Sequence, residues 1–256
     1  VEYVAGDRPR RMRARRVVLA LGVREAPRSA RLVSGTTAGG IMTTGALQSA
    51  VYLGNMTLCR RPVIVGTELV SFSALLTARK AGAKPAAMLE PNHRITAWCP
   101  AALLARLLGV PIHFDVEDLR IEGSPRVEAV GFRNVNGHQR VACDGVVFTG
   151  AFLPESALIR DSHLDFDPDS GGPIVDQFGR LSDPAYFAAG NVLHPVETAG
   201  WCHREGRRTG VLVADDLAGR LPALDRTVTI RGADPVRYVV PQRLALPYPS
   251  DSGVYL

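Results

Sequence analysis

The sequence predicts an α/β fold, because two separate stretches show the order strand, glycine turn, helix. The first stretch covers residues 62–92. It consists of an apolar run, Gly66, an amphipathic segment that ends at Gly82, and a second apolar run that ends at Glu90. This order is the outline of a βαβ unit. The second stretch, residues 186–214, adds one more strand and one more helix.

The second stretch contains the first candidate site. Residues 186–189 read as a buried strand that stops at Gly190 and Asn191, and Ala199 and Gly200 open a segment with helical spacing of small and apolar residues. A glycine turn that feeds a helix N-terminus favours an anion or a sugar hydroxyl, because unpaired backbone N–H groups point toward it. A strand, a turn and a helix also occur together without any ligand.

The rest of the chain predicts further elements. We expect strands at 1–4, 15–21, 111–114, 119–122, 127–133 and 139–143, and helices at 46–55 and 99–108. The Asn136-Gly137 turn and the alternation around it predict that the last four strands form an antiparallel meander. The tail from Asp225 has β-rich runs broken by prolines, so it is either an extra strand pair or an arm that docks on a partner subunit.

The composition limits the class of protein. The chain has 256 residues, of which 46% are apolar and 21% charged, as in an ordinary globular protein with one large or two small domains. No apolar run approaches the roughly 20 residues that span a bilayer, so we expect no transmembrane segment. The cysteines Cys59, Cys99, Cys143 and Cys202 lie far apart and form no CxxC pair. This spacing argues against a metal site and a redox dithiol, and favours a cytoplasmic protein with reduced thiols.

The net charge of +5 has a local source, a run of six arginines within residues 8–16. Basic runs of this kind can bind nucleic acid or anionic lipid. Here no aromatic residue is interleaved and the run leads straight into a strand, so we expect no nucleic-acid binding. A solvated hairpin or a patch that faces a partner protein is the better interpretation.

Two motifs resemble those of flavoproteins with two dinucleotide-binding domains. Residues 187–191, Phe-Ala-Ala-Gly-Asn, followed by Ala199-Gly200, resemble the last flavin-contacting motif of that family, FAxGD, whose acid holds a ribityl hydroxyl of FAD. Asn191 replaces the acid and can accept a hydrogen bond through its amide oxygen. The run Leu19 to Glu25 resembles the ATG motif of the same family, with Gly22 as its glycine and Leu21 in place of the usual threonine.

Three further segments resemble one subfamily. Arg24 to Pro27 together with residues 39–48, GGIMTTGALQ, resemble its R-E-x-P and PGVMTAGALQ patterns, and residues 144–150 resemble its DGVVxAxG return strand. The members are the FAD-containing subunits of opine oxidases, hydrogen cyanide synthase, dye-linked proline dehydrogenases and related sarcosine-oxidase-type complexes.

The resemblance implies two Rossmann-like, three-layer nucleotide-binding domains, the second inserted in the first. We expect an FAD-binding-like domain at 1–55 and 144–225, an inserted NAD(P)-binding-like domain at 56–143, and a C-terminal extension at 226–256. The family begins with a strand, a GxGxxG loop and a helix that this sequence lacks, so the resemblance also implies that the chain is incomplete at its N-terminus.

The phosphate loop of the inserted domain departs from the family pattern. Of the GxGxxG glycines only Gly66 is present, and Glu68 places a negative charge where a pyrophosphate would lie. Glu90 follows Gly66 by 24 positions, near the spacing of an acid that binds an adenosine ribose. Gly66 and Glu90 are therefore weak nucleotide-site candidates, and we expect no use of NAD(P).

The resemblance implies a subunit of an FAD-dependent oxidoreductase. It would oxidise a small amine or amino acid (opine, proline, glycine or sarcosine-like), pass electrons to an acceptor other than NAD, and pair with a second oxidoreductase subunit. The residues expected to line the flavin are Gly22, Gly190, Asn191, Ala199 and Gly200; no catalytic residue is assigned, and neither His194 nor Glu197 beside the loop is given a role in the chemistry. The alternatives are an NAD(P)H-dependent flavoprotein reductase and a non-catalytic scaffold subunit.

Overall fold

The computed structural model describes residues 1–98, 101–195 and 197–246, and the chain folds into two compact units. Unit 1 contains Val1–Arg24 and Phe152–Leu256, and unit 2 contains Glu25–Ala151. Both units are mixed α/β, which confirms the predicted fold class, and the second unit is inserted in the sequence of the first.

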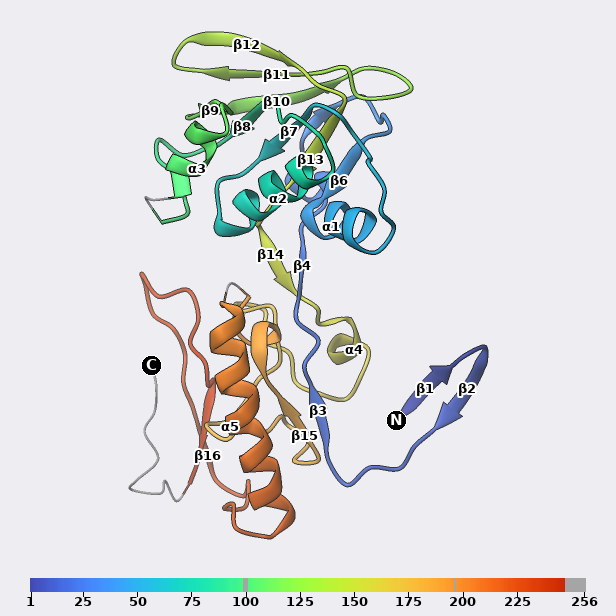
Figure 1. The fold of residues 1–256 in the computed structure, drawn as a ribbon. Helices are drawn as coiled ribbons and strands as arrows, with labels where there is room; N and C mark the ends of the chain where they lie inside the picture. Colours follow the sequence, from blue (N-terminus) through green and yellow to red (C-terminus); the bar gives the residue numbers. More distant parts are fainter. Residues whose placement is uncertain (99–100, 196, 247–256) are drawn as a thin grey trace. The chain divides into compact units, whose positions relative to one another are not determined.

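Unit 2 is built on a parallel sheet of five strands in the order β6-β13-β7-β8-β9 (Figure 1). The strands are β6 (Ile41–Thr43), β13 (Gly145–Phe148), β7 (Pro62–Val65), β8 (Ala87–Leu89) and β9 (Ile112–His113). The predicted βαβ unit is confirmed, with α2 (Leu69–Lys80) between β7 and β8. The strand expected at 111–114 is β9. The sequence predicts that it belongs to the antiparallel meander, but it pairs with β8 and extends the parallel sheet.

Helices and a second sheet cover the two faces of this parallel sheet (Figure 1). The helices are α1 (Thr44–Tyr52), α2 and α3 (Ala101–Leu107). The second sheet contains the predicted meander, β10 (Glu117–Glu122), β11 (Ala129–Asn134) and β12 (Gly137–Ala142), with the short β5 (Ser34–Gly35) beside β10. The result is the three-layer arrangement that the sequence predicts for this part of the chain.

The pattern of β7 explains these layers. Successive side chains of a strand point to opposite faces, so a strand covered on both sides needs an unbroken apolar run. Val63 and Val65 pack with the meander, Ile64 packs with the helices, and all three are buried. The burial of both faces fixes the register, because a shift by one residue would exchange the two sets of side chains.

Unit 1 contains a smaller parallel pair, β3 (Val17–Leu19) and β15 (Tyr186–Ala188), and the long helix α5 (Ala199–Leu217). The N-terminal strands β1 (Glu2–Ala5) and β2 (Arg8–Arg11) form an exposed hairpin, which confirms that the arginine run begins in a hairpin. Further elements are β4 (Val23–Glu25), which pairs with β14 (Phe152–Pro154), α4 (Ala157–Arg160) and two short 3₁₀ turns, η1 (Arg28–Arg31) in unit 2 and η2 (Gly190–Val192) in unit 1.

The C-terminal tail forms a strand pair, one of the two arrangements that the sequence left open. β16 (Thr227–Thr229) and β17 (Arg243–Ala245) are antiparallel. The buried Gln177 side chain holds β17, since its amide donates to the Ala245 carbonyl at 2.9 Å and its carbonyl accepts from the Ala245 N–H at 2.8 Å. Residues 247–256 lie outside the described part of the chain.

The compact units divide at 24/25 and 151/152, whereas the sequence placed the domain boundaries at 55/56 and 143/144. Residues 25–55 and 144–151 pack in unit 2, because β6 and β13 are strands of its parallel sheet. In the described residues, no helix has the length and hydropathy to cross a membrane.

Candidate functional site

The candidate site in unit 1 lies where β3 and β15 end. The two strands are parallel, with Ala188 opposite Leu19, and the next N–H, that of Ala189, donates to the Leu19 carbonyl at 3.2 Å. Carboxyl ends of neighbouring parallel strands meet at one edge, where ligands bind in many α/β proteins. The turns at Gly22 and Gly190, both predicted site residues, therefore follow strands that end at the same edge.

Both glycines have backbone angles that other residues rarely adopt, with φ of +70° at Gly22 and +80° at Gly190. A Cβ atom at Gly22 would meet nothing within 4 Å, and one at Gly190 would meet only the Cys202 side chain, at 3.9 Å. Open space therefore borders both turns. This arrangement fits a flat ligand that approaches the backbone closely, as a flavin would.

Asn191 organises the loop that follows. Its amide oxygen accepts from the Glu197 N–H at 3.0 Å and from the Cys202 thiol at 3.4 Å. These two donors use both lone pairs of the oxygen, so the expected role as an acceptor toward a ligand does not fit. Among the described residues the Asn191 amide nitrogen has no partner, which leaves this side chain as a hydrogen-bond donor.

Helix α5 begins at the predicted position. Thr198 is its N-cap, with extended backbone angles and a hydroxyl that accepts from the Trp201 N–H at 3.3 Å. Ala199 and Gly200 are the first helical residues, and a Cβ at Gly200 would meet nothing within 4 Å. The first turn of a helix has backbone N–H groups without helical partners and a partial positive charge. An anionic or hydroxyl-bearing ligand could use both.

Glu205 belongs to this site, although sequence reasoning missed it. Its carboxylate accepts a hydrogen bond from the Gly190 N–H and so ties α5 to the turn after β15. Burial raises the pKa of the Cys202 thiol, and the negative charge of Glu205 raises it further. Cys202 and Glu205 are three residues apart on one helix face, and this spacing is the only signal in the sequence that could have joined them.

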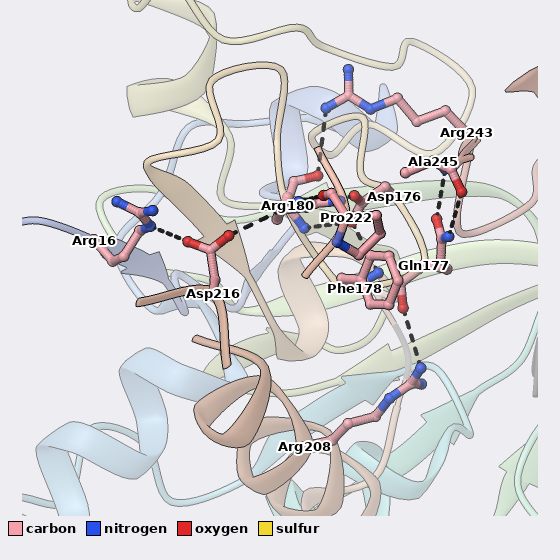
Figure 2. A network of polar contacts seen from close by, with 10 residues as sticks. All are labelled: Arg16, Asp176, Gln177, Phe178, Arg180, Arg208, Asp216, Pro222, Arg243 and Ala245. Atoms are coloured by element: carbon pink, nitrogen blue, oxygen red, sulfur yellow. Dashed lines mark hydrogen bonds and ion pairs between the residues drawn. The ribbon is translucent and has the colours of Figure 1, made fainter. Parts of the chain in front are cut away.

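A buried ion pair shapes the neighbouring turn at 176–180 (Figure 2). The Arg180 Nε donates to Asp176 Oδ2 at 2.8 Å, and the two side chains are 3% and 0% exposed. The other Asp176 oxygen accepts from the N–H groups of Phe178 and Arg180, both at 2.9 Å. The carboxylate is thus fully bonded inside the unit.

Asp216 extends this network to the two elements of the site (Figure 2). It lies near the end of α5, 3.9 Å from Arg180 Nη1, and pairs with Arg16 just before β3. Arg180 Nη1 also donates to the Pro222 carbonyl at 2.6 Å. One chain of charges therefore holds the turn, the end of α5 and the start of β3.

A small cavity of about 90 Å³ separates the 176–180 turn from α5. His194, Trp201, Glu205 and Arg208 are among the residues that line it, and Arg208 donates to the Gln177 carbonyl at 3.2 Å. Ligand pockets usually measure a few hundred Å³ or more. The cavity can hold a few waters or a small ion, but not a flavin ring, so it is not the site proposed for the cofactor.

The second candidate site is the loop after β7 in unit 2. Gly66 has φ of +122°, and its N–H donates to the carbonyl of Leu89, the residue before Glu90, at 2.8 Å, so the structure brings the two weak candidates together. Glu68 stands at the N-cap position of α2. One oxygen of its carboxylate accepts from the Ser71 hydroxyl at 2.8 Å.

The same Glu68 oxygen lies 3.0 Å from the Thr149 hydroxyl. The side chains of Ser71 and Thr149 are fully buried. A Cβ at Gly66 would overlap Thr149 and the Glu68 carboxylate, and a Cβ at Gly150 would overlap the other Glu68 oxygen. The protein's own carboxylate therefore fills the space beside the loop glycines.

Glu90 is also satisfied internally. Its side chain is 2% exposed. One oxygen accepts from the Asn92 N–H at 2.9 Å and from the Asn92 amide at 2.6 Å, and the other accepts from the hydroxyls of Thr67 and Thr96. A ribose hydroxyl would have to displace these partners.

Arg31 is a second residue that sequence reasoning missed. It donates to the carbonyls of Thr149 and Gly150, both at 2.7 Å, and to the Ala26 carbonyl at 2.9 Å. Burial lowers the pKa of its guanidinium, and the negative charges of Glu68 and Glu25 oppose that shift. The positive charge of Arg31 therefore lies near enough to the Glu68 carboxylate for the two to attract each other, while its hydrogen bonds go to backbone carbonyls.

The cysteines within residues 1–98, 101–195 and 197–246, namely Cys59, Cys143 and Cys202, are free thiols, and Cys99 lies outside these ranges. In the same ranges, no group of three or more His, Cys, Asp or Glu side chains could hold a metal ion. His163 pairs with Asp183 at 2.9 Å on an exposed surface.

Several solved structures are similar to this chain. A thioredoxin reductase from T. acidophilum has a TM-score of 0.68 at 16% identity, over 85% of this chain and 70% of its own. An FAD-dependent pyridine nucleotide-disulphide oxidoreductase from Desulfovibrio vulgaris has a TM-score of 0.64 at 23% identity, over 82% and 56%. The putidaredoxin reductase-putidaredoxin complex gives 0.62 at 22% identity, over 84% and 54%. At these identities the likeness shows the fold.

No curated protein sequence matches this chain. A family model, described as pyridine nucleotide-disulphide oxidoreductase, matches residues 2–206. This match includes β3, β15 and the start of α5 in unit 1 and the whole of unit 2, and it covers far more than half of the sequence. The chain therefore belongs to the pyridine nucleotide-disulphide oxidoreductase family.

Proposed function

We propose that this chain is part of an FAD-dependent oxidoreductase whose flavin lies against unit 1. One observation carries the proposal: the glycine turns after two adjacent parallel strands, at Gly22 and Gly190, share an open edge with the first turn of α5. Family membership supports it. The chain spans 56% and 54% of two of the similar structures, so the activity of the whole protein is part of the proposal.

Each expected flavin residue has a role in this proposal. Gly22 and Gly190 let the cofactor approach the backbone, because a side chain at either position would reach into the open space. The Asn191 amide donates to a hydroxyl of the cofactor, and the backbone N–H groups of Ala199 and Gly200 face its electron-rich atoms. FAD would supply the storage of electrons, and the protein would supply binding and orientation.

The flavin proposal is tested by the FAD content of the purified whole protein. Asn191→Leu removes the donor and should lower the flavin absorbance per protein severalfold. Asn191→Asp keeps one oxygen for the loop and offers the other to the same cofactor hydroxyl, which can donate as well as accept, so this variant should retain FAD. Asn136→Leu, in the exposed turn between β11 and β12, is the matched control. Unchanged FAD in Asn191→Leu, with the protein folded, would contradict the proposed site.

We propose a small amine or amino acid as the electron donor, with an acceptor other than NAD. The motifs at Arg24–Pro27 and residues 39–48 support this proposal. The similar structures reported above are not amine oxidases, so the finer resemblance to opine oxidase and hydrogen cyanide synthase subunits gains no support from them. Their descriptions favour a second candidate function, a flavoprotein reductase that takes electrons from NAD(P)H.

Anaerobic reduction distinguishes the two candidates. Flavin that bleaches with proline, sarcosine, glycine or an opine, and not with NADH or NADPH, would support amine or amino-acid oxidation. Flavin that bleaches with NADH or NADPH would support the reductase. A colourless protein, purified with whatever binds it, would contradict both and favour the scaffold subunit.

We also propose a protein partner that takes part in electron transfer. One similar structure is a reductase bound to putidaredoxin, and the exposed β1-β2 hairpin of this chain offers a basic surface with Arg8 and Arg10. The scattered free thiols favour a reducing, cytoplasmic location. Loss of complex formation as the salt concentration rises would support a charged contact at the hairpin.

A further inference from the structure

We propose that Glu68 fills the dinucleotide-phosphate position of unit 2 with the protein's own carboxylate, and that this residue excludes NADH and NADPH. The inference rests on the proposed function and deepens it, because it removes the nicotinamide nucleotides from the possible electron donors. It also assigns the exclusion to one side chain.

The position of the Glu68 carboxylate supports the proposal. In open parallel sheets, phosphates bind at the carboxyl ends of the strands, against the N-terminus of the helix that follows. Glu68 lies between the end of β7 and the start of α2, and its carboxylate contacts Ser71 in the first turn of α2. It also contacts Thr149, which follows β13, the neighbour of β7 in the sheet. A bound phosphate would need the same hydroxyls.

The Glu68 carboxylate also fills the space beside the loop glycines. Gly66 and Gly150 both have positive φ, and a Cβ at either residue would overlap the Glu68 carboxylate. Glycines in such loops let a phosphate approach the backbone. Here the approaching anion is already part of the chain. Glu68 stands where the second glycine of the loop would be, and its carboxylate occupies the space beside Gly66 and Gly150.

The negative charge of Glu68 would oppose a bound pyrophosphate. Arg31 interacts with Glu68, but its own hydrogen bonds go to the carbonyls of Ala26, Thr149 and Gly150. A pyrophosphate beside Glu68 would add like charge a few ångströms from the carboxylate in a partly buried loop. Repulsion at such distances and an intermediate dielectric weakens binding by about 100-fold or more.

The acid at the ribose position, Glu90, is bonded within the protein as well. Glu90 uses both carboxylate oxygens within the protein, on Asn92, Thr96 and Thr67. Thr67, which binds Glu90, lies next to Glu68 in the loop. Glu90 and Glu68 therefore both hold this loop through hydrogen bonds. The contact points for the phosphate and for the ribose are therefore both occupied by groups of the protein.

The test is calorimetric titration of the whole protein with NADH and with NADPH. Wild-type protein should bind both with dissociation constants weaker than about 1 mM. Glu68→Gly, which restores the second glycine of the loop, should bind at least one of them about 30-fold more tightly or better. Glu68→Gln removes the charge but keeps the volume, and should give a smaller gain. Glu128→Gln, at an exposed acid of the same unit, should change nothing.

Two results would overturn the inference. One is tight binding of NADH or NADPH by wild-type protein that Glu68→Gly does not change. The other is the absence of binding in folded Glu68→Gly and in Glu68→Gln alike, because Glu68 would then not be the residue that excludes the nucleotide. The flavin absorbance of the same samples reports separately on the proposed FAD site, so failure of one proposal is distinguishable from failure of the other.

Discussion

The turn at Gly190 in unit 1 and the turn at Gly66 in unit 2 have the same local design and different contents. In both, a glycine with positive φ follows the end of a parallel strand, and an α-helix begins within ten residues of that glycine. At Gly190 a Cβ would meet only Cys202, at 3.9 Å, whereas at Gly66 it would overlap Glu68 and Thr149. The space beside the Gly190 Cα is open, although the Glu205 carboxylate binds the Gly190 N–H, whereas the space beside Gly66 is filled by the protein itself.

The difference teaches how a ligand site can be lost while its fold is kept. A glycine shows only that something approaches the backbone. Whether a ligand can approach also depends on the residue two positions after the glycine. Val192 is a buried core residue after Gly190, whereas Glu68 directs its carboxylate into the space beside Gly66. The predictions below test this contrast, beginning with the largest expected effect.

The open turn depends on neighbours that are held by charge. Arg180→Met should lower the free energy of unfolding by about 3–5 kcal/mol, because Asp176 would remain buried as an unpaired charge. Chemical denaturation measures this change. Arg220→Met removes the exposed ion pair with Asp215 and should lower the free energy by about 1 kcal/mol or less. Equal effects of the two substitutions would mean that the buried network does not support the open site.

The closed turn should be far more sensitive to an added methyl group. Gly66→Ala should lower the free energy of unfolding by about 3 kcal/mol, from the left-handed backbone and from overlap with Thr149 and Glu68. Gly22→Ala has the backbone strain without the overlap, so about 1–2 kcal/mol is expected. Thermal unfolding of the two variants compares them directly. A larger loss of stability in Gly22→Ala than in Gly66→Ala would contradict the conclusion that the Gly66 turn is closed and the Gly22 turn is open.

Much of the fold could be predicted because its signals are local. The apolar run of β7, the turn Asn136-Gly137 and the start of α5 at Ala199 are all visible within a few residues. The position of β13 between β6 and β7 was not predictable in this way, since the order of parallel strands is set by long connections. The divisions between the compact units, at 24/25 and 151/152, differ from the predicted domain boundaries because β6 and β13 belong to the parallel sheet of unit 2.

The candidate sites were predictable only in part. Gly22, Gly190, Gly66 and Glu90 could be found because each follows an apolar run. The contacts of Glu205 and Arg31 could not, because their partners are backbone groups far away in the chain, at Gly190 and at Thr149 and Gly150. Arg180 lies four residues after Asp176, but the sequence does not show that this pair is buried. The orientation of Asn191 was also hidden, since its oxygen is used within its own loop.

The two units should also differ at alkaline pH. Burial raises the pKa of Cys59 and of Cys143, both in unit 2, to about 11. The folded state therefore favours the neutral thiol, so the stability of unit 2 is full below the ordinary thiol pKa of 9.0 and falls as the pH rises toward 11. Each thiol contributes up to about 2–3 kcal/mol over this window.

Denaturation of wild type and of Cys59→Ala at pH 8 and pH 10.5 measures the effect of one thiol. The cavity left by the substitution lowers stability at both pH values, whereas the loss between the two pH values should be smaller in the variant. An identical loss in both proteins would mean that the Cys59 thiol does not contribute to the alkaline destabilisation.

The smallest expected effect compares the two helix starts. Thr198 caps α5 beside the open turn, and Thr43 caps α1 in unit 2, each by accepting from a backbone N–H in the first turn. Thr198→Ala and Thr43→Ala should each lower the free energy of unfolding by about 1 kcal/mol. Only Thr198→Ala should also lower the FAD content, because only α5 presents its first turn to the proposed flavin, and Thr198→Ser should restore it. If both substitutions lowered FAD content equally, general loss of stability would explain the effect, and the open edge of unit 1 would have no special part in binding.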